Sequence, residues 1–129
     1  MSEMRQRRRM WQVFVDAGRG IRMAAQSERN LRIHLAVIPI VVVTGFVMGL
    51  SGMEWVAIVF SIGIVIVAEL VNSALEYLAD AVHPEVDPGI RNAKDVAAGA
   101  VLIAVLAAVV VGVIIFLPKL WEIWKQLQS

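Results

Sequence analysis

The chain of 129 residues is 59% hydrophobic and 18% charged, with a mean hydropathy of +0.73 and a formal net charge of +1. This balance excludes an ordinary soluble domain of this size and is typical of a protein that crosses a membrane several times. The absence of cysteine excludes disulfides and thiolate metal sites.

The N-terminal segment, residues 1–32, is strongly basic and is predicted to lie at the membrane surface. Eight of the twelve basic residues fall in it, and all eight are arginine. Apolar residues recur at helical spacing over residues 10–30, at Trp11, Phe14, Ile21 and Ala25. This pattern predicts an amphipathic surface helix. Glu28 follows Ile21 by seven residues and shares the apolar face, so we expect it to point towards the spanning helices.

Three apolar runs are long enough to cross a bilayer core, which takes about 20 helical residues. They cover residues 33–50, 55–78 and 96–117. The first connection, "SGME", is short and predicts an antiparallel hairpin, whereas the second is polar and contains two prolines. We therefore predict an all-α integral membrane protein, with a three-helix membrane domain at 33–120 and a C-terminal tail at 121–129.

The distribution of positive charge predicts the orientation of these helices. The N-terminal segment is basic and the second loop adds Arg91 and Lys94, whereas the first loop has no basic residue. Positively charged loops remain on the cytoplasmic side. We expect a multi-pass plasma-membrane protein with its N-terminus in the cytoplasm and its C-terminus outside.

Small residues mark two expected helix-packing faces. The first span contains "GFVMG", a GxxxG motif formed by Gly45 and Gly49. The third span repeats a small residue every four positions, at Ala100, Ala104, Ala108 and Gly112. Such rows let helix backbones approach closely in lipid, so both are predicted to pack against neighbouring helices.

The second span carries an acidic stripe, which we define as Glu69, Asn72, Ser73, Glu76 and Asp80. At 100° per residue, all of these except Ser73 fall within about 80° of one another, and Ser73 lies beside them. Measured along the helix from its outer end, Glu69 lies ~21 Å deep and Asp80 ~37 Å deep. The stripe therefore starts within the inner leaflet and emerges at the cytoplasmic headgroups.

An ionisable group in the apolar region costs ~2.5–3.5 kcal/mol and usually marks a functional site. Structural alternatives are an interhelical hydrogen-bond clamp for Glu69 and Asn72, a solvated helix end for Asp80, and a positive-inside anchor for Lys94. Several carboxylates beside a lysine suit Mg²⁺ bound together with substrate phosphates. The two histidines, His34 and His83, lack metal-ligand spacing and are interpreted as interface residues.

Two motifs resemble the signature of the small prokaryotic diacylglycerol kinase family of integral membrane lipid kinases. They are "ELVNSALEYLAD", which contains the acidic stripe, and "AKDVAAGAVL" at the start of the third span. "ERNLRIH", "FVDAGRG" and "IFLPKL" are similar to the undecaprenol kinase branch of that family. The resemblance covers residues 13–120, although many members carry a histidine-containing triplet where this chain has "EVD" at 85–87.

The resemblance implies a homotrimer of three-span protomers whose active sites are shared between subunits. It implies Mg²⁺-dependent transfer of the γ-phosphoryl group of ATP to a membrane lipid alcohol. By motif, Glu69 matches the general base, and Glu28 and Glu76 match the metal ligands. The residues that match the nucleotide site are Glu28, Asn72, Glu76, Glu85, Asp87, Lys94 and Asp95. Arg9 matches an arginine that contacts phosphate or substrate, and Glu69 is expected to contact the substrate as well.

Two other functions remain open from the sequence. Diacylglycerol is the alternative acceptor, since only the branch motifs favour undecaprenol. A small transporter or channel is the non-enzymatic alternative, but the outer half of the second span offers only Ser61 as a polar group. A conduit needs polar groups across the whole membrane, so the stripe is better interpreted as a pocket that opens on one side. The expected partners are ATP, a lipid alcohol and the bilayer, and no nucleic acid.

Overall fold

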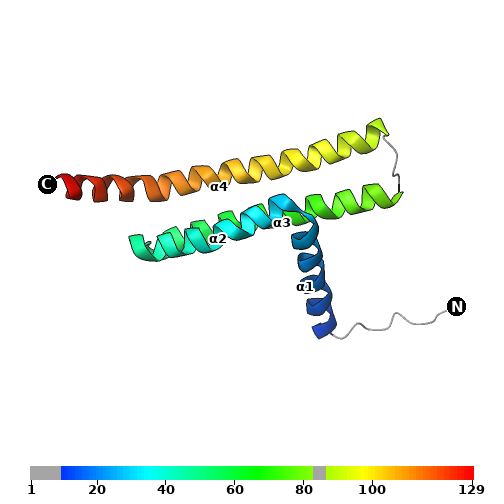
Figure 1. Ribbon diagram of the computed structural model, residues 1–129, viewed down its shortest axis with the longest axis horizontal. Helices are drawn as coiled ribbons and strands as arrows, with labels where there is room; N and C mark the ends of the chain where they lie inside the picture. The colour runs from blue at the N-terminus through cyan, green and yellow to red at the C-terminus, as the bar shows by residue number, and fades with distance from the viewer. Residues whose placement is uncertain (1–9, 83–86) are drawn as a thin grey trace.

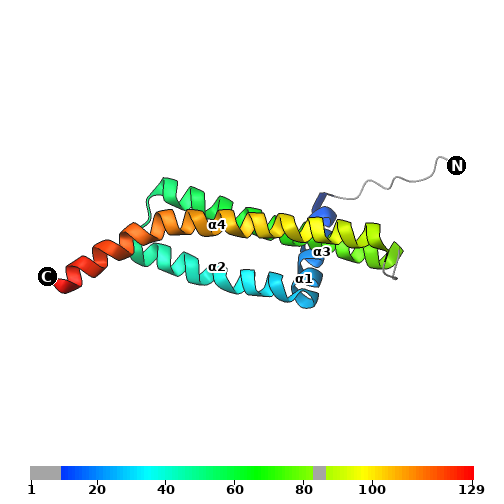
Figure 2. The same ribbon diagram turned by 90° about the horizontal axis from the view of Figure 1, so that it is seen from above.

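The computed structural model describes residues 10–82 and 87–129, and within them every element is a helix. The helices are α1 (Met10–Ser27), α2 (Arg29–Met48), α3 (Gly52–Val82) and α4 (Pro88–Gln128). Helices α2, α3 and α4 run alongside one another, while α1 projects steeply from the start of α2, beside α3 and on the side away from α4 (Figures 1 and 2). The predicted all-α architecture of three long helices and a separate N-terminal helix is confirmed.

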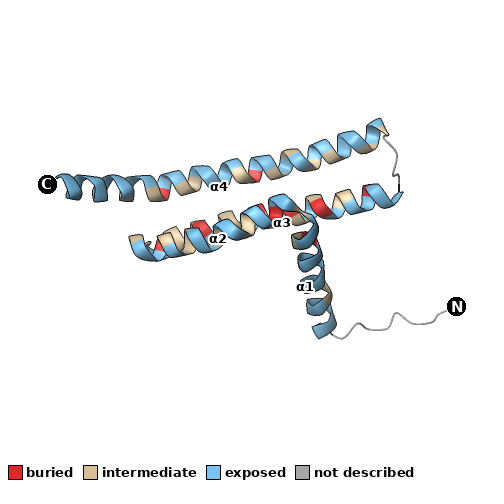
Figure 3. Ribbon diagram, in the orientation of Figure 1, coloured by how far each residue is buried: buried red, intermediate tan, exposed pale blue. Residues whose placement is uncertain are grey.

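The three long helices are each long and apolar enough to cross a membrane. Most of their surface is exposed in the single chain (Figure 3), including large apolar side chains such as Phe46, Phe60 and Ile114. Apolar side chains of this size are stable on the outside of a protein that lipid or other helices surround. The chain is therefore a multi-pass membrane protein.

Helix α4 is much longer than the apolar run that predicted it. Its 41 residues extend over about 60 Å, twice the ~30 Å hydrocarbon core. The helix continues past Pro118 and through the segment 121–129 to Gln128. The helix is therefore too long to lie within the hydrocarbon alone, and its start lies beside the end of α3 (Figure 1).

Both glycines of the GxxxG motif contribute to the hairpin between α2 and α3. Gly49 ends α2 in the left-handed conformation with φ 68°, which favours glycine. The N–H of Leu50 donates to the carbonyl of Gly45 at 3.1 Å. The Trp55 ring lies against Gly45 and 4.8 Å from the Phe46 ring, centroid to centroid. Gly45 is thus buried against the neighbouring helix α3, as the motif predicts, while Gly49 forms the turn and nothing lies within 4 Å of a Cβ added there.

The corner between α1 and α2 is fixed by side-chain hydrogen bonds. Glu28 separates the two helices in an extended conformation, with φ −101° and ψ 113°. The hydroxyl of Ser27 is hydrogen-bonded to the Tyr77 hydroxyl on α3. The Arg32 guanidinium donates to the carbonyl of Gln26 at 2.7 Å, which satisfies one of the last carbonyls of α1. These bonds hold the corner against α3.

Candidate functional site

Glu69 lies in the middle of α3 and is the most buried charged residue of the described chain, with 3% of its surface exposed. Its carboxylate Oε1 is 3.1 Å from Nε2 of His34 on α2. The imidazole N–H is not aligned on that oxygen, so within residues 10–82 and 87–129 Oε1 has no hydrogen-bond partner. A buried polar atom without a partner is costly, and such atoms mark candidate functional groups.

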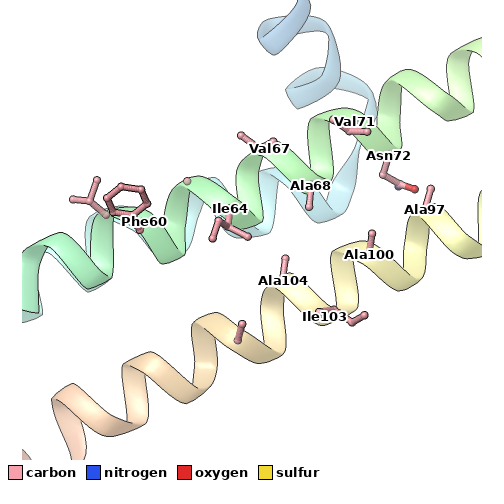
Figure 4. A pocket seen from close by; sticks show the side chains of 13 residues that line it. Phe60, Ile64, Val67, Ala68, Val71, Asn72, Ala97, Ala100, Ile103 and Ala104 are labelled. Atoms are coloured by element: carbon pink, nitrogen blue, oxygen red, sulfur yellow. The ribbon is translucent and has the colours of Figure 1, made fainter.

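Asn72 lies one turn further along α3, beside a groove of about 750 Å³ between α3 and α4. Its side chain points from α3 towards Ala97 of α4 (Figure 4). Asn72 is the one polar residue of the groove lining, and no described residue is hydrogen-bonded to its Oδ1. The α4 side consists largely of alanines such as Ala100 and Ala104. The row of small residues on α4 thus leaves open space beside the amide of Asn72. Ala104, one member of that row, is buried as predicted.

The acidic stripe becomes more exposed along α3. Ser73 is almost fully buried, and its hydroxyl donates to the backbone carbonyl of Glu69 at 2.9 Å. This hydroxyl is therefore engaged with the backbone and not with the Glu69 carboxylate. Glu76 is half-buried and Asp80 is exposed. The stripe thus opens towards the end of α3, as the sequence predicted.

The charged groups at the open end of the stripe join α3 to α4. Lys94 Nζ lies 2.6 Å from Asp80 Oδ1, and the charge of Glu76 also acts on the lysine. Asp95, the next residue on α4, is exposed. Asp80 is exposed, as the alternative of a solvated helix end predicts, but that alternative does not predict its ion pair with Lys94.

Asp87 starts α4 as its N-cap. Its Oδ1 accepts hydrogen bonds from the backbone N–H groups of Gly89 at 2.8 Å and Ile90 at 3.2 Å. This is the usual way in which an aspartate stabilises a helix start. Glu85 and Arg9, the two other sequence-predicted site residues of the loop and the N-terminus, lie outside the described residues.

The hydrogen bond between Ser27 and Tyr77 also bears on the site. Ser27 directly precedes Glu28, and Tyr77 directly follows Glu76, so the bond brings the backbones of the two predicted metal ligands to the same corner. Glu28 is half-buried there. No three Asp, Glu or His side chains of the described residues are close enough to hold a metal ion by themselves.

His34 is the residue of the site that the sequence interpretation missed. It was assigned to the interface because it lacks metal-ligand spacing, yet it contacts the buried Glu69. The available signal was its position as a polar side chain after the basic start of an otherwise apolar helix. That pattern does not identify a partner on another helix.

The fold and the site define a small membrane protein with a buried carboxylate that opens, along one helix, onto a cluster of charged residues. Residues 16–116 match the family model described as Prokaryotic diacylglycerol kinase. The chain therefore belongs to the prokaryotic diacylglycerol kinase family and is a lipid kinase.

Individual relatives agree with this assignment. The chain is 41% identical over 112 residues to the undecaprenol kinase of Bacillus subtilis (strain 168), which covers 87% of this chain and 91% of that protein. It is 34% identical over 122 residues to the diacylglycerol kinase of Synechocystis sp., covering 88% and 70% of the two chains. Identity to the diacylglycerol kinase of Escherichia coli (strain K12) is 29% over 92 residues, covering 71% and 75%.

Proposed function

We propose that this protein phosphorylates undecaprenol with ATP at the cytoplasmic face of the plasma membrane, which yields undecaprenyl phosphate. The choice of acceptor is supported by the similarity to the Bacillus subtilis undecaprenol kinase, which covers most of both chains. The observation that carries the chemistry is the Glu69 carboxylate, which is buried in the middle of α3 with 3% of the residue's surface exposed. Diacylglycerol remains the second candidate acceptor, favoured by the names of two other relatives.

In the proposed reaction Glu69 is the general base. The proton of the acceptor hydroxyl passes to the Glu69 carboxylate while the hydroxyl oxygen forms a bond to the γ-phosphorus. The bond from that phosphorus to the bridging oxygen breaks, and ADP leaves. A long-chain alcohol stays dissolved in the bilayer and offers its hydroxyl near the headgroups, whereas ATP arrives from water. A buried base suits the lipid alcohol, and the exposed, charged end of the acidic stripe suits ATP, so the two substrates can react where these parts of the site adjoin.

Glu28 and Glu76 would hold the Mg²⁺ ion of the proposed reaction. The ion is usually bound by one or two carboxylates together with substrate phosphates. Two glutamates near one corner fit a metal that arrives with ATP, even though the described residues offer no cluster of three ligands. When bound, the ion would neutralise charge on the phosphates.

The remaining proposed contacts follow the family motif. Asn72, Lys94 and Asp95 would line the nucleotide site together with the loop residues Glu85 and Asp87. Arg9 would contact the substrate. The unpartnered Asn72 amide oxygen supports its part in this proposal, since a ligand would supply the missing contact.

A homotrimer with shared active sites completes the proposal. Its support is the exposed apolar surface of α2, α3 and α4 and the open groove beside Asn72, both of which a neighbouring protomer would cover. Cross-linking in micelles should trap trimers, and only monomers in a fully active sample would contradict this. The N-terminus and the loop between α3 and α4 would then face the cytoplasm.

The proposed function is tested by transfer of labelled γ-phosphate in mixed micelles containing undecaprenol or diacylglycerol, with and without Mg²⁺. Undecaprenol should be the faster acceptor, and chelation of Mg²⁺ should abolish transfer. Glu69→Gln preserves the shape of the side chain and removes the base, so turnover should fall about 10²- to 10⁴-fold. The matched control is Glu122→Gln, an exposed glutamate paired with Lys125 on the last part of α4. Faster transfer to diacylglycerol would refute the acceptor, and full activity of Glu69→Gln would refute the base.

A further inference from the structure

The contact between His34 and Glu69 joins two helices at the deepest charged group of the site. Nε2 of His34 and Oε1 of Glu69 are 3.1 Å apart, and the two side chains are 25% and 4% exposed. Within the described ranges, no other basic side chain lies within ion-pair distance of Glu69. His34 is therefore the one basic side chain of the described residues that contacts this carboxylate.

The rest of the surroundings leaves the carboxylate without a second anchor. The neighbouring Ser73 hydroxyl is bonded to the Glu69 backbone carbonyl, and Oε1 has no aligned donor among the described residues. Nε2 of His34 is nonetheless within 3.1 Å of Oε1. Hydrogen bonds of catalytic groups are often poorly aligned before the substrate binds and tighten in the substrate complex.

We propose that His34 is a positioning residue for Glu69: it holds Oε1 from the α2 side and thereby leaves Oε2 directed towards the acceptor hydroxyl. This inference rests on the proposed function of Glu69 as the base. A carboxylate that rotates freely presents a lone pair to the hydroxyl only part of the time, and fixed orientation raises the rate of the chemical step. The proton passes from the hydroxyl to Oε2, and His34 takes no part in that transfer.

The packing around His34 allows clean substitutions. The side chain also lines a cavity of about 280 Å³ between α2, α3 and α4, whose remaining lining is apolar except for Ser61. A leucine or a glutamine at position 34 is of similar size and has this space available, so overpacking is not expected. Glutamine keeps an N–H donor near the position of Nε2, whereas leucine removes it.

The test is a double-mutant cycle on transfer of labelled γ-phosphate to undecaprenol. His34→Leu should lower kcat about 10- to 100-fold, as contacting residues do in such cycles, while the KM for ATP stays within about twofold. His34→Gln should restore kcat to within about threefold of the wild type because it keeps the donor. In the Glu69→Gln background, His34→Leu should have no further effect. Val41→Ala, which changes the same cavity from α2, is the control and should leave kcat unchanged.

Three results would overturn the role of His34 while the proposed function stands: unchanged kcat in His34→Leu, no rescue by glutamine, or losses that multiply with Glu69→Gln. Wild-type protein that transfers no phosphate would instead refute the proposed function, and the role of His34 with it. If His34→Leu does not fold, ¹⁵N NMR spectra of histidine-labelled protein test the contact between His34 and Glu69 instead. The His34 ring signals, assigned by their loss in His34→Gln, should shift in Glu69→Gln, and unchanged signals would refute the contact.

Discussion

Replacing Lys94 by methionine should weaken ATP binding much more than replacing its partner Asp80 by asparagine. The two side chains form one ion pair 2.6 Å long, so a purely structural role predicts equal effects for the two substitutions. The proposed function predicts unequal effects, because Lys94 would exchange its contact with Asp80 for a contact with the phosphates of ATP. Comparing the two substitutions therefore distinguishes a purely structural role of Lys94 from a role in binding ATP.

The magnitudes follow from the exposure of the pair. The Asp80 side chain is 68% exposed and that of Lys94 34%, and an ion pair this accessible to water changes an equilibrium by a factor of about five at most. Asp80→Asn should therefore leave the KM for ATP within about fivefold of the wild type. Loss of a charge-assisted contact to phosphate is larger, so Lys94→Met should raise that KM about 10- to 100-fold.

The assay is an ATP titration of phosphate transfer at saturating lipid acceptor in mixed micelles. Lys119→Met is the matched control, because Lys119 Nζ and Glu54 Oε2, 3.2 Å apart, form the other ion pair between α3 and α4, near the opposite end of α3. This variant should keep the wild-type KM. Equal effects of Lys94→Met and Asp80→Asn would refute the phosphate contact and leave the pair as a structural link.

Two further predictions concern stability, measured by unfolding in micelles. Gly45→Ala should destabilise the protein by about 1–2 kcal/mol, because overpacking outweighs the better helix propensity of alanine: the added Cβ would lie 2.6 Å from the Trp55 ring. Gly20→Ala on α1, where nothing lies within 4 Å of the added Cβ, should be neutral or slightly stabilising, and equal losses at the two glycines would contradict the packing argument. Asp87→Ala should cost about 1 kcal/mol through loss of the α4 cap. Asp87→Asn keeps a capping oxygen and should recover that stability, and an equal loss in both variants would exclude the cap.

The number and type of the long helices were predictable from the sequence, whereas their ends were not. An apolar run of about 20 residues has few stable conformations other than a spanning helix, because the backbone must satisfy its own hydrogen bonds in lipid. Helix ends depend instead on local capping. Helix α2 stops at Gly49 because a glycine adopts the left-handed turn, and α4 starts at Asp87 because its carboxylate caps the first N–H groups. Hydropathy does not report either feature.

The stripe itself was predictable from helical periodicity, but the contacts of its members were not. Periodicity assigns Glu69, Asn72 and Glu76 to one face of α3 without fixing how α2 and α4 are rotated against that face. The contact of His34 with Glu69 depends on this rotation. The GxxxG motif is a related case: it predicts the close approach to Gly45 but not that the hairpin turn brings Trp55 there.

The order of the charged groups along α3 constrains how the proposed reaction is arranged. Glu69 and Asp80 are eleven residues apart, which is about 16 Å along the helix, and burial decreases in the same direction. The proposed base, Glu69, therefore lies at the deep end and Lys94, paired with Asp80, at the exposed end. In the proposed reaction, ATP that enters from water would meet the lysine first, and a lipid alcohol would reach the proposed base from the bilayer. Transfer requires the γ-phosphorus beside Glu69, so we expect the triphosphate to extend along the stripe past Asn72, with the nucleoside towards the exposed end of α3.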